Sequence, residues 1–280
     1  QPVIIIGAPR SGTNMIRNAI TSFDKIDTWP FDETNFIWKY GHNINKSDEL
    51  NINEITKEKI QYVNNQFSKI ALKNNSEFVV EKTCANSLRV SYVDKILPNA
   101  KFIFIYRNGI DVTISAEKKW KEGLDRKNIF KKILWFNFSY MIKFFLYKLF
   151  KKIQFFLKGK KYSVWGPEIE NIEKYISKYD LYTVCALQWL RCIELADQGL
   201  KNIDSNRIFK LKYEDFIENP NLYLEKILKF LGIDYNRTQL SQASLGINMK
   251  KNYRTGRKFN DINRQKIYKR LSAALSKYGY

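Results

Sequence analysis

Residues 7–14, Gly-Ala-Pro-Arg-Ser-Gly-Thr-Asn, form a short loop bracketed by two glycines, with one cation, Arg10, between them. The apolar run 3–6 precedes this loop, and a helical pattern begins near residue 12. A strand that turns tightly into a helix gathers several backbone N–H groups and a positive helix terminus around one point, where a phosphate group can bind. The loop therefore predicts an anion site that Arg10 reaches from inside the turn, and a tight turn without a ligand is the plainer alternative.

Gly7 and Gly12 have the spacing of the P-loop of nucleoside-triphosphate-binding proteins, G-x-x-x-x-G-K-[ST]. Thr13 stands where that motif requires lysine, and Asn14 stands where it requires the hydroxyl group that binds magnesium. Phosphoryl transfer from ATP loses its main charge stabilisers without these two groups. A nucleotide kinase is therefore a minor alternative.

A second segment with anion-binding character is Phe-Ile-Phe-Ile-Tyr-Arg-Asn-Gly-Ile-Asp-Val-Thr-Ile-Ser, residues 102–115. Arg107 follows a predicted buried strand, and Ser115 falls in the second turn of the predicted helix that comes next. Both side chains can converge on one phosphate group, which would receive a bidentate charged contact and a hydroxyl contact. The alternative is an ordinary strand-to-helix corner capped by Asp111.

Together, these two segments resemble the sulfotransferases that use 3′-phosphoadenosine 5′-phosphosulfate (PAPS) as sulfonate donor. Pro-Arg-Ser-Gly-Thr is similar to the phosphosulfate loop, [KR]-S-G-T, of tyrosylprotein and carbohydrate sulfotransferases and their bacterial relatives, and Arg107 with Ser115 resembles the 3′-phosphate motif R-x7-S. The resemblance implies that Arg10 also stabilises the charge on the leaving phosphate. It implies that the donor is bound by Arg10, Ser11, Gly12, Thr13, Asn14, Arg107 and Ser115.

Two further segments extend the resemblance, so that it covers residues 4–258. Leu-Lys-Tyr-Glu-Asp-Phe-Ile-Glu-Asn-Pro, residues 211–220, is similar to a family signature whose tyrosine contacts the adenine, which assigns that role to Tyr213. The basic segment 253–261 resembles the loop that closes over the 3′-phosphate and nominates Arg257 and Lys258, with Arg254 in reserve. A tyrosine packed in the core and a solvated run of charges are the respective alternatives.

Sulfonate transfer needs a deprotonated acceptor, charge stabilisation on the leaving oxygen and in-line placement, and it requires no metal. The resemblance assigns Lys82 to the bridging oxygen or the acceptor, and it assigns Glu33 as general base, with Glu81 in reserve. Cytosolic members of the family carry a histidine two residues after such a lysine, but Cys84 stands there. The single histidine, His42, lies in another loop and is expected to be a surface residue.

The elements that position these residues alternate between strands and helices. Apolar runs at 3–6, 78–80, 102–106 and 207–211 are continuous, as in strands buried on both faces of a parallel sheet. Helical spacing occurs near 12–22, 87–97, 110–122, 180–199, 221–231 and 261–277. Pro220 begins and Gly232 ends the clearest helix. The pattern predicts an α/β fold, and the resemblance implies a three-layer, P-loop-like form with a central parallel sheet between helices.

The chain of 280 residues has a net charge of +20 and 44 % hydrophobic residues, enough for a sizeable core. Two stretches, 118–161 and 250–270, carry the positive excess, which attracts polyanions. The basic, aromatic segment 127–161 contains four lysines between Ile133 and Leu157, so it suits a position in the membrane interface better than a membrane span. An equally good alternative to the membrane interface is a helix buried against the sheet, with its lysines reaching out to solvent.

The sequence lacks repeats and flexible linkers, which predicts a single domain over 1–280 with a helical insert at about 120–165. Its three cysteines predict a reducing, cytoplasmic location. If the insert binds lipid, the protein would lie at the periphery of the membrane. A trimmed N-terminal leader or anchor stays open as an alternative.

The resulting hypothesis is a PAPS-dependent sulfotransferase that modifies a hydroxyl group of a glycan or glycolipid. Protein-tyrosine sulfotransfer is the nearest alternative, since the loop and Glu33 resemble that branch equally well. Nucleic acid is not an expected partner of such an enzyme. The alternative of another class is a non-enzymatic basic module that binds anionic membrane or nucleic acid.

Overall fold

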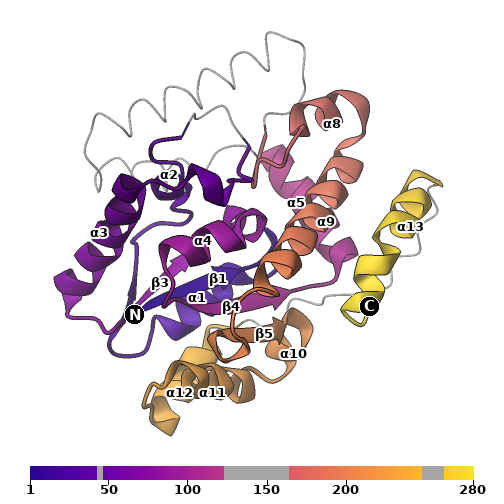
Figure 1. The fold of residues 1–280 in the computed structure, drawn as a ribbon. Helices are drawn as coiled ribbons and strands as arrows, with labels where there is room; N and C mark the ends of the chain where they lie inside the picture. The colour runs from indigo at the N-terminus through magenta and orange to yellow at the C-terminus, as the bar shows by residue number, and fades with distance from the viewer. Residues whose placement is uncertain (43–46, 123–163, 248–261) are drawn as a thin grey trace.

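The computed structural model describes residues 1–42, 47–122, 164–247 and 262–280, and its centre is a parallel sheet of five strands (Figure 1). The strand order is β2-β3-β1-β4-β5, and every neighbouring pair runs parallel. In chain order the strands are β1 Pro2–Ile6, β2 Ile26–Thr28, β3 Phe78–Lys82, β4 Lys101–Tyr106 and β5 Ile208–Lys212. The parallel sheet confirms the α/β class expected from the continuous apolar runs.

Alternate residues of the central strands fill two separate cores. In β1, Val3 and Ile5 face one core while Ile4 and Ile6 face the other, and all four side chains are fully buried. Burial on both faces explains why the run is apolar throughout and not alternating. Helices must therefore cover both sides of the sheet.

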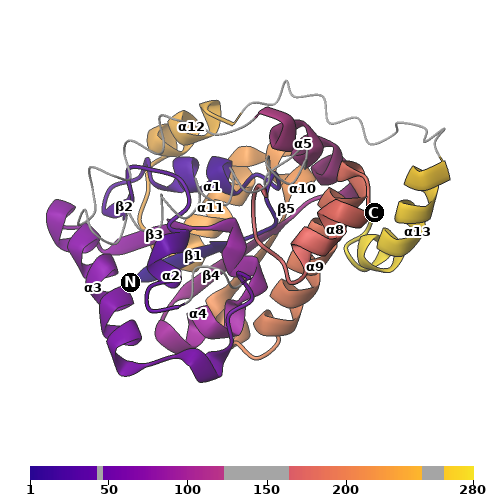
Figure 2. The same ribbon diagram turned by 90° about the horizontal axis from the view of Figure 1, so that it is seen from above.

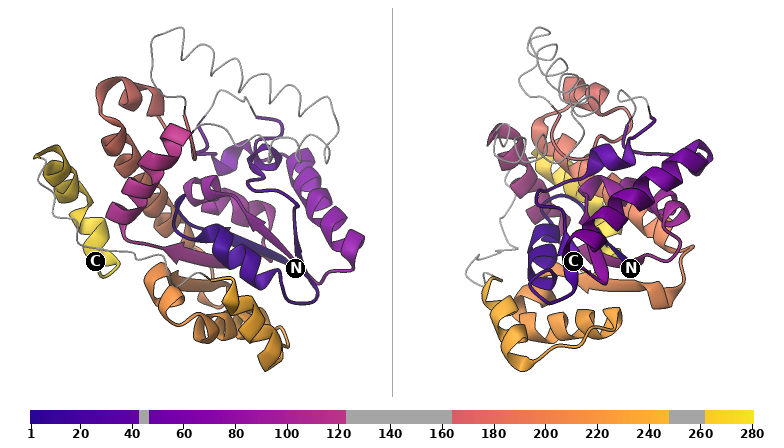
Figure 3. Two further views of the ribbon diagram at one scale, coloured as in Figure 1. Left: turned by 180° about the vertical axis from the view of Figure 1, so that it is seen from behind. Right: turned by 90° about the vertical axis from the view of Figure 1, so that its left-hand side faces the viewer.

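One face of the sheet is covered by α1 Thr13–Ile20, α10 Tyr213–Glu218, α11 Pro220–Leu231 and α12 Arg237–Leu245. The opposite face is covered by α3 Lys57–Asn74, α4 Val90–Ile96, α5 Gly109–Glu122 and α9 Leu181–Leu200. Figure 2 shows the two layers on either side of the sheet, and Figure 3 shows indigo α1 near the orange helices α11 and α12. Shorter pieces and the last helix are α2 Asn35–Trp38, η1 Ile52–Glu54, η2 Cys84–Leu88, α8 Ile172–Lys178, η3 Ser205–Arg207 and α13 Ile262–Lys277.

The carboxyl ends of the strands share one edge of the sheet, and β1 is its switch point. From β1 the chain first builds β2 and β3 on one side and then crosses back to build β4 on the other. In open α/β sheets the loops at such a point spread apart and form a ligand crevice. The segments 7–12, 29–34 and 83–84, together with Arg107 and Tyr213, all follow strand ends at this edge.

Helix α11 begins with Pro220 in its first turn and ends at Gly232, which has φ +80°, as its sequence predicts. Several elements were not expected: β2, α2, the long helix α3, and the shorter helices α8, α10 and α12. The helix expected at 87–97 is divided into the 3₁₀ turn η2 and α4, and Arg89 lies between them.

Candidate active site

The loop between β1 and α1 is built around two residues with left-handed backbone conformation, Arg10 with φ +72° and Gly12 with φ +93°. Gly12 precedes α1, and no side chain caps that helix terminus. A Cβ atom on Gly12 would lie 2.5 Å from the ring of Tyr213, so this position needs glycine for both its conformation and its space. The N–H groups at the start of α1 are thus available to an anion.

Arg107 joins the second anion segment to this loop. Its Nη1 donates a hydrogen bond to the carbonyl oxygen of Arg10 over 2.9 Å. The side chain of Arg10 reaches in the other direction, where its Nε donates to Oγ of Ser115 over 3.0 Å. Two loops separated by nearly a hundred residues in sequence are therefore in direct contact, and the side chains predicted to bind anions lie close together.

Tyr213 lies between these loops. Its ring contacts the Gly12 backbone, and the guanidinium carbon of Arg107 lies 4.5 Å from the ring centroid, a cation–π arrangement. The residue is only 3 % exposed, which leaves little ring surface for an adenine base. The adenine contact assigned to Tyr213 stays a prediction, while its packing role is visible.

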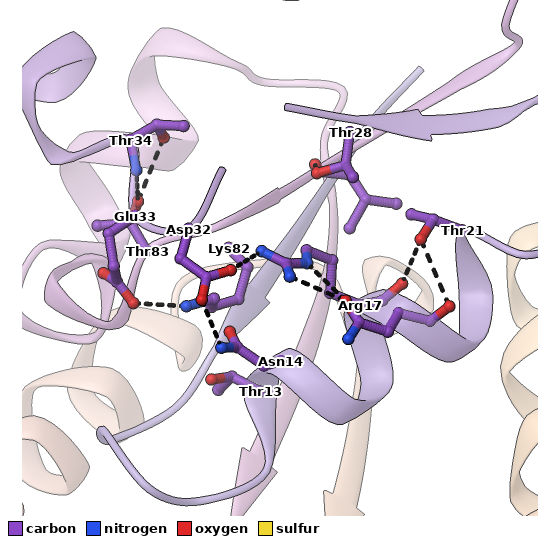
Figure 4. A network of polar contacts seen from close by, with 12 residues as sticks. Thr13, Asn14, Arg17, Thr21, Thr28, Asp32, Glu33, Thr34, Lys82 and Thr83 are labelled. Carbon is purple, nitrogen blue, oxygen red and sulfur yellow. Dashed lines mark hydrogen bonds and ion pairs between the residues drawn. The ribbon is translucent and has the colours of Figure 1, made fainter. Parts of the chain in front are cut away.

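Glu33 and Lys82 meet at the adjacent strand ends (Figure 4). Lys82 Nζ donates to Glu33 Oε1 over 2.5 Å, and the backbone N–H of Cys84 donates to Oε2 over 2.9 Å. Lys82 is almost completely buried, whereas 37 % of the Glu33 side chain is exposed. Burial alone would lower the pKa of Lys82, but the nearby acidic groups, led by Glu33 and including Asp32, together outweigh burial and raise that pKa, so the amine is a cation.

Asp32 ties the same loop to α1 through Asn14 and Arg17 (Figure 4). The amide of Asn14 donates to Asp32 over 2.8 Å, and the Arg17 guanidinium forms an ion pair with the same carboxylate. Burial opposes ionisation of Asp32, but Lys82 and Arg17 hold its pKa below the ordinary value. The Asn14 side chain, expected at the donor, thus contacts the loop that carries Glu33.

Glu81, the reserve candidate for the base, is fully buried. Its carboxylate accepts hydrogen bonds from Thr34, Thr83 and Asn86. Burial raises the pKa of Glu81, and the hydroxyl donors oppose that effect. A side chain closed off in this way has no access to an acceptor.

The remaining candidates are placed as follows. Ser11 and Thr13 are buried in the loop, and Thr13 Oγ1 lies 3.7 Å from the thiol of Cys84. His42 contacts Tyr92 and Glu54, and its side chain is only 8 % exposed, so the expectation of a surface residue is wrong. Arg254, Arg257, Lys258 and the segment 127–161 lie outside the described residues, so their assignments stay predictions.

Sequence reasoning missed three residues of this region: Arg17, Thr34 and Thr83. All three are polar, Thr34 and Thr83 immediately follow Glu33 and Lys82, and Arg17 comes three residues after Asn14. A polar residue directly after a predicted strand end is the one signal that could have nominated Thr83.

No group of three or more potential metal ligands occurs among the described residues. In the same portions of the chain, no helix has both the length and the apolar character needed to cross a bilayer.

Comparison with known proteins supports one family for the whole arrangement. The model of the sulfotransferase family matches residues 2–130 and 161–237. A protein-tyrosine sulfotransferase of Drosophila melanogaster is 23 % identical over 247 residues, a match that covers 84 % of this chain and 39 % of the fly protein. The chain therefore spans well under half the length of this curated relative.

Solved structures with the same fold are also sulfotransferases. The sulfotransferase domain from the curacin biosynthetic pathway superposes with a TM-score of 0.52 at 12 % identity and covers 96 % of both chains. A sulfotransferase from Mycobacterium avium superposes with a TM-score of 0.59 at 11 % identity, covering 99 % of this chain and 76 % of its own. Since the family model matches most of the chain, the protein belongs to the sulfotransferase family.

Proposed function

We propose that this protein transfers a sulfonate group from PAPS to a hydroxyl group of an acceptor. In this reaction the acceptor oxygen forms a bond to sulfur, and the bond between sulfur and the bridging oxygen of PAPS breaks. The bridging oxygen keeps the electron pair and leaves as part of adenosine 3′,5′-bisphosphate. The acceptor proton passes to a protein base.

The observation that carries the proposal is the direct contact between the two anion loops. Arg107 donates to the Arg10 carbonyl, and Arg10 donates to Ser115, so the groups suited to two different phosphates lie side by side. A donor with phosphates at both its 3′ and 5′ positions matches such a pair of sites.

The residues present fit that donor. Oγ of Ser11 is buried and has no hydrogen-bond partner among the described residues, as expected of a group that awaits a ligand oxygen. The uncapped start of α1 supplies amide donors for the 5′-phosphate, together with Arg10. Arg107 and Ser115 would hold the 3′-phosphate.

Glu33 and Lys82 would carry out the proton transfer and the charge stabilisation. The exposed part of the Glu33 carboxylate is the part that an acceptor hydroxyl can reach, and it would receive the proton. The Lys82 cation beside it would stabilise the negative charge that develops on the bridging oxygen. Because Lys82 is buried, its charge acts with little screening by water.

The acceptor we propose first is a glycan or glycolipid hydroxyl, in line with the resemblance of the loop to carbohydrate sulfotransferases. A peptidyl tyrosine is the second candidate, supported by the similarity to a protein-tyrosine sulfotransferase of Drosophila melanogaster.

A transfer assay with ³⁵S-labelled PAPS tests the proposal, using glycan, lipid and tyrosine-peptide fractions as acceptors. We expect label in one fraction, and Glu33→Gln should lower kcat by at least about 100-fold, since a general base contributes 10²–10⁴. The matched control is Glu77→Gln, because Glu77 pairs with Lys25 over the same 2.5 Å at the opposite end of β3. This control should keep full activity.

Absence of label in every fraction would contradict the proposal that the protein is a sulfotransferase. Full activity of Glu33→Gln would contradict the proposal that Glu33 is the general base. The non-enzymatic basic module predicts a different pattern. Its binding to anionic vesicles or nucleic acid would weaken steeply with salt and would not respond to adenosine 3′,5′-bisphosphate.

A further inference from the structure

Glu33 has φ +59°, a left-handed backbone conformation that is uncommon for a residue with a side chain. Such strain costs of the order of 1 kcal/mol or more and persists where the surrounding structure enforces it. The same residue carries the exposed carboxylate beside Lys82. The residues on either side of it, Asp32 and Thr34, are each held by side chains from other elements.

On the N-terminal side, Asp32 is anchored to α1. Its carboxylate accepts from the Asn14 amide and pairs with Arg17, so residue 32 is tied to the helix that starts at the phosphate loop. This anchor is polar and partly exposed.

On the C-terminal side, Thr34 is anchored at the end of β3 by two bonds, and Figure 4 shows the one between its backbone N–H and Thr83. Its backbone N–H donates to Thr83 Oγ1 over 2.8 Å, and its hydroxyl donates to the Glu81 carboxylate. Thr34 is 2 % exposed and Glu81 is fully buried, so water does not compete for these bonds. This second anchor is therefore the stronger constraint.

The donors around Glu81 have one consistent orientation. Arg89 Nε donates to Asn86 Oδ1 over 2.9 Å, and a guanidinium can only donate. The NH₂ group of Asn86 must then face Glu81, to which it donates over 2.7 Å. Thr83 already accepts from the Thr34 N–H, which leaves its own proton for Glu81. Each of these donors therefore has one acceptor, and the hydrogen-bond pattern specifies one position for Thr34.

Consecutive residues of β3 point to opposite faces of the sheet. Lys82 meets the Glu33 carboxylate on one side, while Glu81 holds the residue after Glu33 on the other. The end of β3 thus holds the loop at two points, the strained residue itself and the residue after it.

We propose that Glu81 is a positioning residue that, through Thr34 and Thr83, keeps Glu33 in its left-handed conformation and aims its carboxylate at the acceptor. The inference rests on the proposed function, because it assigns a task to Glu33 as the base. It also gives Glu81 a role other than that of a reserve base.

The test compares two substitutions of Thr34 in the full chain. Thr34→Val keeps the branched shape and removes the hydroxyl, whereas Thr34→Ser keeps the hydroxyl. A displacement of about 1 Å at a reacting group can cost 10²-fold in rate. We expect Thr34→Val to lower kcat roughly 10- to 100-fold, because losing the hydroxyl lets the Glu33 carboxylate shift. Thr34→Ser keeps the hydroxyl and should stay within about 3-fold of the parental kcat. Both variants should bind adenosine 3′,5′-bisphosphate as the parent does.

Thr28→Val is the matched control. The Thr28 hydroxyl, at the end of β2, donates over 2.8 Å to the carbonyl of Val80 in β3, the strand that also carries Glu81. It has no hydrogen bond to Glu33 or Glu81. This variant loses a similar hydrogen bond and should keep the parental kcat. Equal kcat values for the two Thr34 variants, or an equal loss in Thr28→Val, would overturn the proposal.

A double-substitution cycle with Glu33→Gln separates positioning from a general structural defect. If Thr34 acts through Glu33, adding Thr34→Val to Glu33→Gln should cost less than 3-fold, because the base is already gone. A full 10- to 100-fold loss in that background would also overturn the proposal. Failure of the proposed function gives another result, in which Glu33→Gln itself keeps the parental activity or the parent transfers no sulfonate.

Discussion

The substitution Gly12→Ala probes the phosphate loop most sharply, because this residue has both an unusual conformation and a close neighbour. Its φ is +93°, and an added Cβ would lie 2.5 Å from Tyr213 Cδ2. A left-handed conformation costs a residue with a Cβ about 1–2 kcal/mol. Overpacking against the buried ring adds about 1–3 kcal/mol. We expect the free energy of unfolding to fall by about 2–5 kcal/mol in total.

Gly232→Ala is the control that isolates the conformational part. Gly232 has φ +80°, and an added Cβ there would have no atom within 4 Å. It should lose only about 1–2 kcal/mol. At about 2–4 °C per kcal/mol for a chain of this size class, the two variants should differ clearly in Tm.

The same melts should be repeated with adenosine 3′,5′-bisphosphate. At 100 times its Kd, a ligand stabilises the native state by about 2.7 kcal/mol, and a 10-fold weaker complex gains only about 1.4 kcal/mol. We expect the smaller gain in Gly12→Ala, since the shifted loop misplaces the amides at the start of α1, and the full gain in Gly232→Ala. Equal loss of Tm in both variants, or a full ligand gain in Gly12→Ala, would refute this reasoning.

Two further predictions concern single side chains at the site. Since Lys82 and Arg17 hold the pKa of Asp32 below its usual value despite burial, its contribution to stability is present above about pH 4 and is lost as the pH falls through the lowered pKa. Asp32→Asn should therefore lower Tm at pH 7 and flatten the acid side of a plot of Tm against pH; an unchanged profile would contradict the ion pair. Burial raises the pKa of the Cys84 thiol well above its usual range, so iodoacetamide at pH 8 should leave Cys84 unmodified in the native protein and modify it in urea. Peptide mass spectrometry measures this difference, and rapid native modification would count against the buried environment.

The strands β1, β3 and β4 could be predicted because burial on both faces dictates their apolar runs, whereas β5 lies at the sheet edge and is only partly buried. The strand Ile26–Thr28 could not, since it is three residues long and only Ile26 is apolar. Helix α3 has a weak sequence signal for a related reason. Its buried side chains include the polar Lys59 and Gln66, which interrupt the apolar stripe formed by Val63, Phe67 and Ile70.

The two anion loops could be nominated from the sequence because loop chemistry is local: glycines, a cation and a helix start lie within a few residues. The contacts that hold the backbone of Glu33 could not be predicted from the sequence. Thr34 and Glu81 are 47 residues apart, and contacts between hydroxyl and carboxylate groups leave no periodic pattern. The burial of Tyr213 between Gly12 and Arg107 likewise depends on how β4 and β5 pair, which is a property of the whole sheet.

The central claim is that the two loops hold the two phosphate-bearing ends of one donor, and calorimetric titration tests it most directly. Adenosine 3′,5′-bisphosphate and adenosine 5′-monophosphate should be titrated into the parent, Arg107→Ala and Arg207→Ala. The last variant is a matched control, because Arg207 donates to the Ala100 carbonyl over 3.0 Å and lies over the Phe102 ring, away from the site.

The account predicts that the parent and Arg207→Ala prefer the bisphosphate by roughly 10- to 150-fold, the equivalent of about 1.5–3 kcal/mol for a charged hydrogen-bonded contact. Arg107→Ala should lose most of this preference, because only Ser115 then remains for the 3′-phosphate. A preference for the bisphosphate that survives undiminished in Arg107→Ala would contradict the account.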